Sequence, residues 1–282
     1  MQIKKTSRTI LIGILLLALL SSFSNDVYAL SNKDQNQSLK QSNVALMSEE
    51  NILFYYQEYT KTVSATSTPG QKSVEGFIQY AVDQGLINDT PAERTSIEIV
   101  TYRALFRAAA DAGEALGFTT GAHFLRHSIQ DAPSNLVYNA SSTYAAQILS
   151  SEEMSTIRSR FSIAVSGKGY STYTMTGSIT LNSTTDLHLA YNAVSYTVVG
   201  NSLAGGKWNL TIIIRDRYDF EQQAWGNLSL ADILVTFINN QAASVQELGA
   251  IVPYDIQVTI NTIALERIAE INRVDPPTQL LK

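Results

Sequence analysis

The sequence predicts an α+β fold in which an N-terminal helical half is followed by an antiparallel β-sheet packed against a long helix. Apolar residues recur near every 3.6 positions up to residue 166 and near every second position from residue 167 onward. With 45% hydrophobic and 16% charged residues, the composition is that of a globular protein rather than a disordered one. We therefore expect a helical region at 44–166 and an α+β region at 167–282.

The N-terminus has the pattern of a secretory signal peptide. Basic residues in the first eight positions precede an apolar run from Ile10 to Leu20, and small side chains at Val27 and Ala29 mark a cleavage site. We expect residues 1–29 to be removed after Ala29 and the protein to be secreted. The polar stretch 30–43 lacks the apolar residues needed to fix a structure and is predicted to be a flexible leader.

Composition also excludes several classes of site and partner. The chain contains no cysteine, so disulfides, a lipoprotein attachment thiol, a cysteine nucleophile and cysteine-ligated metals are all excluded. A formal net charge of −5 is opposite in sign to the charge of nucleic-acid binders, and no nucleic-acid partner is expected. No second apolar run of membrane-spanning length follows the N-terminal one.

Within the helical region, apolar residues at helical spacing alternate with stop signals. Gly85 and Gly117 are typical C-terminal stops, and Pro91 suits the first turn of the helix that follows it. Ser150 and Glu153 have the spacing of a capping box ahead of another helix. The predicted helices are 48–59, 73–84, 92–116, 119–129, 142–149 and 152–165.

In the α+β region, short Asn, Ser, Thr and Gly connectors separate alternating segments, as antiparallel hairpins require. The long helix expected to pack on the sheet begins at a capping sequence at Ser229 and ends at Gly249. The predicted strands are 170–181, 187–199, 208–214 and 256–263.

The candidate site follows the third predicted strand, in a turn-like sequence. Asp216 and Asp219 stand three residues apart and flank Tyr218, so we expect two acids and a phenol to converge on one small volume. Convergent carboxylates suit a divalent cation such as Mg²⁺, a phosphoryl group or acid–base catalysis. The alternative is a strand-end turn in which the aspartates cap the backbone and the aromatic side chains pack beneath.

The order Asp216-x-Tyr218-Asp219 resembles the signature of the colicin M family of lipid II-degrading bacteriocins, and the resemblance covers roughly Gly167 to Ile263. It implies a Mg²⁺-dependent phosphodiesterase that cuts the undecaprenyl–pyrophosphate linkage of a lipid-linked cell-wall precursor at a membrane surface. On this resemblance Asp216, Tyr218 and Asp219 are catalytic, and Asp216 and Asp219 are the metal ligands. The sequence does not identify an immunity partner.

The chain departs from the family pattern where the family has a His-Arg pair. Trp225 and Gly226 occupy that region, and no histidine follows His188. Phosphoryl transfer needs positive charge and a proton carrier. His188, in the predicted strand 187–199, is the candidate catalytic proton carrier, and a cross-strand partner or a surface histidine is the alternative.

His123 and His127 share a helical face four residues apart and, together with Asp131, have the residue types of a second metal site. The intervening residues lack the glutamate that turns such a pair into a metallohydrolase motif. The alternative is a pair of interior or capping histidines.

Two functions therefore remain open. The first is a secreted, bacteriocin-like enzyme that acts on a lipid-linked precursor. The second is a non-enzymatic secreted binding or interaction protein with a degenerate toxin-like fold, in which the acids of the motif only shape a turn.

Overall fold

The computed structural model of the protein describes residues 51–59 apart from 53 and 57, residues 74–220 and residues 242–265. The predicted signal peptide, the leader and most of the helix 229–249 lie outside these ranges. The chain divides into two compact units. The helical unit comprises the described residues up to 135 together with those between 217 and 255, and the sheet unit comprises 136–216 and the described residues from 256 onward.

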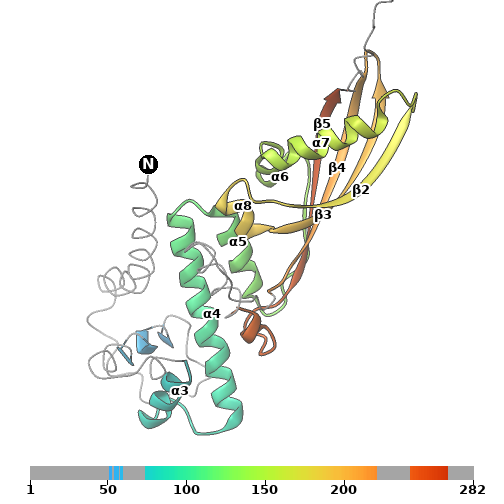
Figure 1. Cartoon of the computed structure of the whole chain (residues 1–282). Helices are drawn as coiled ribbons and strands as arrows, with labels where there is room; N and C mark the ends of the chain where they lie inside the picture. Colours follow the sequence, from blue (N-terminus) through green and yellow to red (C-terminus); the bar gives the residue numbers. More distant parts are fainter. Residues whose placement is uncertain (1–50, 53, 57, 60–73, 221–241, 266–282) are drawn as a thin grey trace, which may run out of the picture. The chain divides into compact units, whose positions relative to one another are not determined.

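The five strands form one sheet in the order β1-β5-β4-β3-β2 (Figure 1). β2, β3 and β4 pair antiparallel in sequence order, whereas β1 runs parallel to β5. The α+β class is thus confirmed, and the sheet is mixed because of the unpredicted three-residue strand β1. The strands are β1 (Leu136–Tyr138), β2 (Thr172–Thr180), β3 (Ala193–Leu203), β4 (Lys207–Tyr218) and β5 (Tyr254–Leu265).

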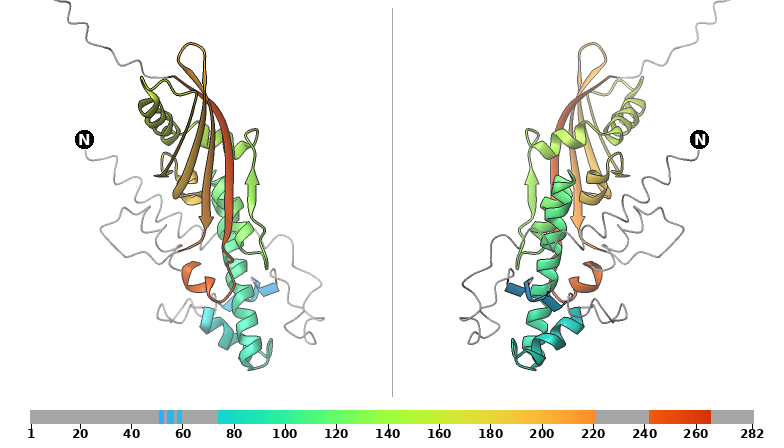
Figure 2. Two further views of the ribbon diagram at one scale, coloured as in Figure 1. Left: turned by 90° about the vertical axis from the view of Figure 1, so that its right-hand side faces the viewer. Right: turned by 90° about the vertical axis from the view of Figure 1, so that its left-hand side faces the viewer.

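Helix α7 (Glu152–Val165) lies along one face of this sheet (Figures 1 and 2). Its Phe161 is fully buried and packs edge-to-face on Trp208, with ring centroids 5.4 Å apart. Gly200 of β3 makes room for that ring, since a Cβ there would overlap it. The sequence predicted that helix 229–249 packs on the sheet. In the described part of the sheet unit, α7 is a helix that packs there.

Two shorter helices, α6 (Thr143–Leu149) and α8 (Thr185–Ala190), complete the sheet unit. The prediction of a strand over 187–199 is wrong in its first part, because α8 occupies residues 185–190 and β3 begins only at Ala193. The Thr184 hydroxyl caps this helix by accepting from Leu187 N at 3.2 Å. The buried side chains of Leu187, Ala190 and Tyr191 follow helical spacing, which the apparent alternation around His188 conceals.

The predicted capping box at Ser150 is also wrong by one residue. Ser151 is the N-cap of α7, and its hydroxyl accepts from Met154 N at 3.3 Å. Glu153 instead turns to the loop after β2, where its Oε1 accepts from the backbone N–H groups of Asn182 and Ser183 at 2.9 and 2.7 Å. The carboxylate thereby ties the start of α7 to the sheet.

These hydrogen bonds make a pH-dependent contribution to stability. Burial would raise the pKa of Glu153, but the donors of Ser183 and Asn182 outweigh it and hold the pKa below its usual value. The contribution is therefore present above the ordinary carboxyl pKa and is lost as the pH falls through the lowered one. We expect Glu153→Gln to lower the free energy of unfolding by about 1 kcal/mol at neutral pH.

Urea denaturation of wild type and variant at neutral and acidic pH measures this difference, which should shrink in acid. Glu152→Gln, at the exposed neighbouring position, is the matched control and should change little at either pH. An equal loss for both variants, or a loss that does not depend on pH, would contradict the assignment.

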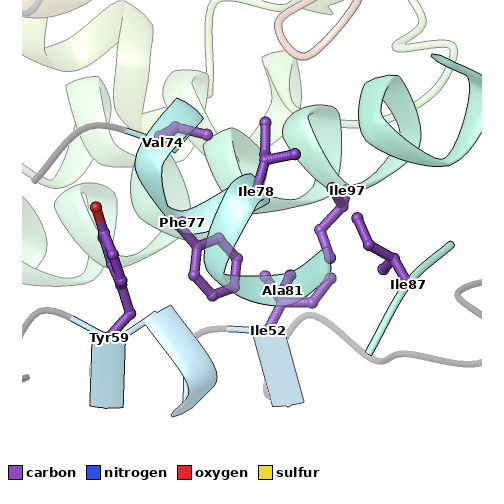
Figure 3. Close-up of a cluster of buried hydrophobic side chains, with 8 residues drawn as sticks. All are labelled: Ile52, Tyr59, Val74, Phe77, Ile78, Ala81, Ile87 and Ile97. Atoms are coloured by element: carbon purple, nitrogen blue, oxygen red, sulfur yellow. The ribbon is translucent and has the colours of Figure 1, made fainter. Parts of the chain in front are cut away.

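In the helical unit, α3 (Val74–Asp83), α4 (Pro91–Ala115) and α5 (Thr119–Ser128) confirm the predicted helices at these positions. The described residues among 51–59 are also helical, and they bury Ile52 and Tyr59 against Phe77 and Ile97 (Figure 3). None of the helices in the described residues is both long and apolar enough to cross a membrane.

Arg103 of α4 joins this helix to a distant part of the same unit. Its guanidinium donates to the carbonyl oxygens of Gly249 and Ala250 at 2.9 and 3.3 Å and forms an ion pair with Asp131. Its side chain is only 15% exposed, and both hydrogen bonds are partly buried. Arg103 therefore fixes the segment that leads into β5.

Candidate functional site

The first part of the motif does not form a turn, because β4 continues through Asp216 and ends only at Tyr218. Arg215 pairs in register with Ser195 of β3, and the strand extends to Tyr218. Arg215 and Arg217 are exposed, Asp216 is half-buried and Tyr218 is buried, as alternation along a strand requires. Asp216 thus points to the face of β4 opposite both arginines, and the expectation of a turn at 216–218 is wrong.

Asp216 belongs to the sheet unit and Tyr218 and Asp219 to the helical unit. The chain passes from one unit to the other between Asp216 and Arg217.

In the sheet unit, Asp216 lies near the buried side chain of Tyr191, which follows α8. Burial, then the neighbouring Tyr138 and Tyr144, and then the carboxylates of Asp216 and Asp186 raise the pKa of Tyr191 well above its usual value. Tyr191 therefore stays protonated at any physiological pH. Its hydroxyl oxygen is buried, and the two carboxylates act on it through their charge.

Asp186, the other carboxylate near Tyr191, is buried in α8 and is held by a side-chain amide. Gln147 of α6 donates from Nε2 to Asp186 Oδ2 at 2.8 Å. The rings of Tyr138 and Tyr144 lie against each other with centroids 4.1 Å apart. Burial and the neighbouring Tyr144 hydroxyl raise the pKa of Tyr138 as well. We call Tyr138, Tyr144, Asp186, Tyr191 and Asp216 the tyrosine–carboxylate group.

His188 lies two residues after Asp186 in the same helix, so its predicted place in a strand is wrong. The side chain is partly buried, and its Nδ1 is buried without a hydrogen-bond partner among the described residues. The role of His188 as the proton carrier stays a prediction.

In the helical unit, Tyr218 is part of an aromatic cluster. Its ring packs against Phe124, Phe220 and Tyr254, with centroids 5.9, 5.2 and 5.3 Å away. The Tyr254 hydroxyl donates to the carbonyl oxygen of Phe124 at 2.9 Å, and this bond fixes the cluster to α5. Tyr218 is only 7% exposed, so packing accounts for its position.

Asp219 follows the end of β4 and is exposed. Arg217 lies between it and a second acid, with Nε 3.7 Å from Asp219 Oδ2 and Nη1 3.1 Å from Asp255 Oδ1. The longer of the two ion pairs is the one within the motif. Both pairs are well exposed, and such pairs contribute little to stability.

The alternative metal site at His123 and His127 does not assemble. The ring of His127 packs edge-to-face on Tyr254 at 4.6 Å, and its Nε2 lies 2.7 Å from the carbonyl oxygen of Ser134. Asp131 is paired with Arg103. Burial and the neighbouring His127 and Arg126 lower the pKa of His123. Within the part of the chain that the structure describes, no three His, Asp or Glu side chains come together as a metal-binding group.

Sequence reasoning missed Tyr191, which lies near the half-buried Asp216, and also Asp186, which lies near Tyr191 and is held by Gln147. The sequence did contain a signal for Asp186. Asp186, Leu187 and Ala190 have helical spacing, which predicts that Asp186 lies on the buried face of a helix. Nothing in the sequence indicates that Tyr138 and Gln147 lie close to these residues, because the juxtaposition depends on the pairing of β1 with β5 and on the packing of α6.

A scan against protein-family models gives no match, and a search of curated proteins gives none either. Among solved structures, the chain is similar to the bacteriocin syringacin M from Pseudomonas syringae pv. tomato DC3000. The two share 12% identity over 82% of this chain and 90% of that one, with a TM-score of 0.34. It is also similar to PaeM, a colicin M-like bacteriocin of Pseudomonas aeruginosa, with 11% identity over 90% and 80% of the two chains and a TM-score of 0.30. Similarities of this size do not place the chain in that family.

Proposed function

We propose that the chain is a secreted, bacteriocin-like phosphodiesterase that hydrolyses the pyrophosphate linkage of a lipid-linked cell-wall precursor. The main observation in its favour is the position of Asp216, the first acid of the motif, half-buried beside the neutral phenol of Tyr191. A carboxylate in such a place is partly shielded from water yet reachable from outside, which suits an acid–base group.

Residues within and near the motif would have distinct tasks. Asp216 would accept a proton from the attacking water, with the buried, neutral Tyr191 nearby and out of contact with the substrate. His188 would return a proton to the leaving phosphate. Arg215 and Arg217, exposed on the other face of β4, would attract the anionic substrate without reaching the reacting phosphorus.

The proposed metal ligands, Asp216 and Asp219, are of the right residue type, since Mg²⁺ is usually held by one or two carboxylates together with water and substrate phosphates. Asp216 is half-buried and Asp219 is exposed, and they belong to different units. When bound, the ion would neutralise charge on the phosphoryl oxygens. Asp219 would release Arg217, to which it is joined by the longer and weaker of the two ion pairs.

The second candidate function is a secreted binding protein without catalytic activity. It is favoured by the structural contacts in the helical unit, where Tyr218 is buried among aromatic rings and Asp219 and Asp255 share Arg217. On this view the acids only help to hold the strand end.

Asp255 provides a matched control that separates the two functions, since it pairs with the same arginine but lies outside the motif. We expect Asp216→Asn and Asp219→Asn to lower the rate of release of the soluble pyrophosphoryl fragment from purified lipid II by about a hundredfold or more. Asp255→Asn should change the rate by no more than about threefold. Each variant is checked for folding by circular dichroism.

Cleavage should require Mg²⁺ and stop with EDTA. His188→Gln should lower the rate by about a hundredfold and remove one limb of the pH–rate profile. If well-folded wild-type protein cleaves nothing with or without Mg²⁺, the phosphodiesterase proposal fails and the binding protein is the better account. Equal rates in the Asp219 and Asp255 variants would remove Asp219 from the site.

A further inference from the structure

The charges of the protein are distributed unequally between its two units. In the described part of the helical unit, acidic residues outnumber basic ones by more than two to one. In the described part of the sheet unit, basic residues outnumber acidic ones. Three of its four acidic residues are buried or half-buried, and Glu152 is the exposed one. The charged residues of the sheet unit are Arg158, Arg160, Lys168, Lys207 and Arg215, and Glu152, Glu153, Asp186 and Asp216.

Two of these basic residues lie at one end of the sheet. The loop from β3 to β4 closes this end (Figure 2), with Leu203 paired to Lys207 across it. The segment 166–171, which leads from α7 to β2, lies beside that loop, since Ser202 N donates to the carbonyl oxygen of Ser171 at 2.8 Å. We call segment 166–171 and residues 203–207 together the hairpin end.

The hairpin end also exposes apolar side chains. Leu203 and Tyr170 are each 44% exposed, and Tyr170 stacks on Tyr173 with ring planes 7° apart. Gly205 and Gly206 have positive φ values of 74° and 67°, so the turn is tight, and two of its three residues carry no side chain.

Among the residues that the structure describes, no carboxylate lies near the two lysines at this end. The hairpin end contains no Asp or Glu, and Glu152 begins the 14-residue helix α7, about 20 Å from the end of that helix nearest to segment 166–171. The combination is a leucine and a tyrosine flanked by lysines in a unit whose exposed charge is positive. Such groups suit the boundary between anionic headgroups and acyl chains, where aromatic rings and lysine stems lie with their polar tips in water.

We propose that the hairpin end is a contact site for anionic phospholipid membranes, with Leu203 and Tyr170 entering the headgroup boundary and Lys168 and Lys207 binding lipid phosphates. This inference goes beyond the proposed hydrolysis and does not depend on it. Lys207 begins β4 and Asp216 lies near the other end of that strand, about 30 Å away at strand spacing. The two sites can therefore be tested separately.

The absence of cysteine allows a direct test on the full chain. Leu203→Cys provides a unique thiol for the environment-sensitive fluorophore NBD. Val137→Cys, at a position that is 71% exposed in β1, is the matched control. With vesicles of phosphatidylglycerol and phosphatidylcholine, the label at 203 should shift its emission to the blue and brighten several-fold, while the label at 137 should not. Vesicles of phosphatidylcholine alone, or high salt, should reduce the response at 203.

Charge-reversal variants test the role of the lysines. Lys207→Glu in the labelled chain should raise the lipid concentration for half-maximal response by about tenfold. Arg107→Glu, which makes the same change in net charge at an exposed position of the helical unit, should have little effect. Asp216→Asn should keep the full response, whatever it does to hydrolysis. No response at 203, or equal responses at 203 and 137, would overturn the proposal.

Discussion

Replacing Phe161 by alanine is expected to lower the free energy of unfolding of the sheet unit by about 3–5 kcal/mol. The ring is fully buried between α7 and the sheet and packs edge-to-face on Trp208 and Tyr173, with centroids 5.4 and 5.8 Å away. Gly200 supplies no side chain that could move into the space. The variant would lose the transfer energy of the ring and leave a cavity that its neighbours cannot close.

Urea denaturation followed by far-UV circular dichroism measures this loss, and near-UV signals report the packing of Trp208. Ile163→Ala, two residues further along the same helix and 60% exposed, is the matched control and should cost less than about 1 kcal/mol. Similar losses in the two variants would show that α7 does not pack on the sheet through Phe161. A variant too unstable to purify would be replaced by Phe161→Leu, for which about half the loss is expected.

The second large effect is expected at Arg103, in the helical unit. Its guanidinium satisfies the carbonyl oxygens of Gly249 and Ala250, and Arg103→Met would leave both without a donor while preserving much of the side-chain volume. Hydrogen bonds from a charged donor are individually strong, and an unsatisfied buried carbonyl adds a desolvation cost. We expect a loss of about 3 kcal/mol.

Arg126 provides the comparison for this prediction. It pairs with Asp111 and Glu114 on the exposed side of the same unit, and Arg126→Met should cost less than about 1 kcal/mol. Loss of Arg103 should also increase the rate of amide hydrogen exchange more in residues 249–252 than elsewhere, because this segment loses the hydrogen bonds that hold it. Unchanged exchange there would show that the carbonyls are held by other contacts.

The helices were the most predictable part of the fold because their signals are local. Thr90 and Pro91 define the start of α4, and Gly117 follows its end. Such caps act within one turn, so the residues that determine them are neighbours in the sequence. The error of one residue at Ser151 arose because two adjacent serines offer the same hydroxyl, and only the packing of α7 decides between them.

The strands were predicted less well, because their limits depend on partners that lie far away in the chain. β4 extends beyond Ile214 since Ser195 of β3 is present to pair with Arg215. β1 forms a strand because it pairs with β5, with Leu136 opposite Ile256. A polar sequence such as Arg215 to Arg217 has no strand signal of its own, and its conformation is decided by the neighbouring strand.

The residues of the motif could be selected from their types, but their surroundings could not. Carboxylates flanking a tyrosine are visible in the sequence, whereas the burial of Tyr218 among Phe124 and Tyr254 depends on the packing of α5. In the same way, the neutral state of Tyr191 follows from burial and from neighbours on four elements. Electrostatic environment is a property of the folded chain.

The strand order has a consequence for how the protein folds. β5, the last described strand, is an interior strand between β1 and β4, and its partner in β1 precedes it by more than a hundred residues. Loop closure over this length must come before the sheet gains any of its central contacts. A topology rich in such non-local pairs folds slowly. The nascent chain can therefore form its local helices early, while the sheet unit stays incomplete until nearly all of the described residues have been synthesised.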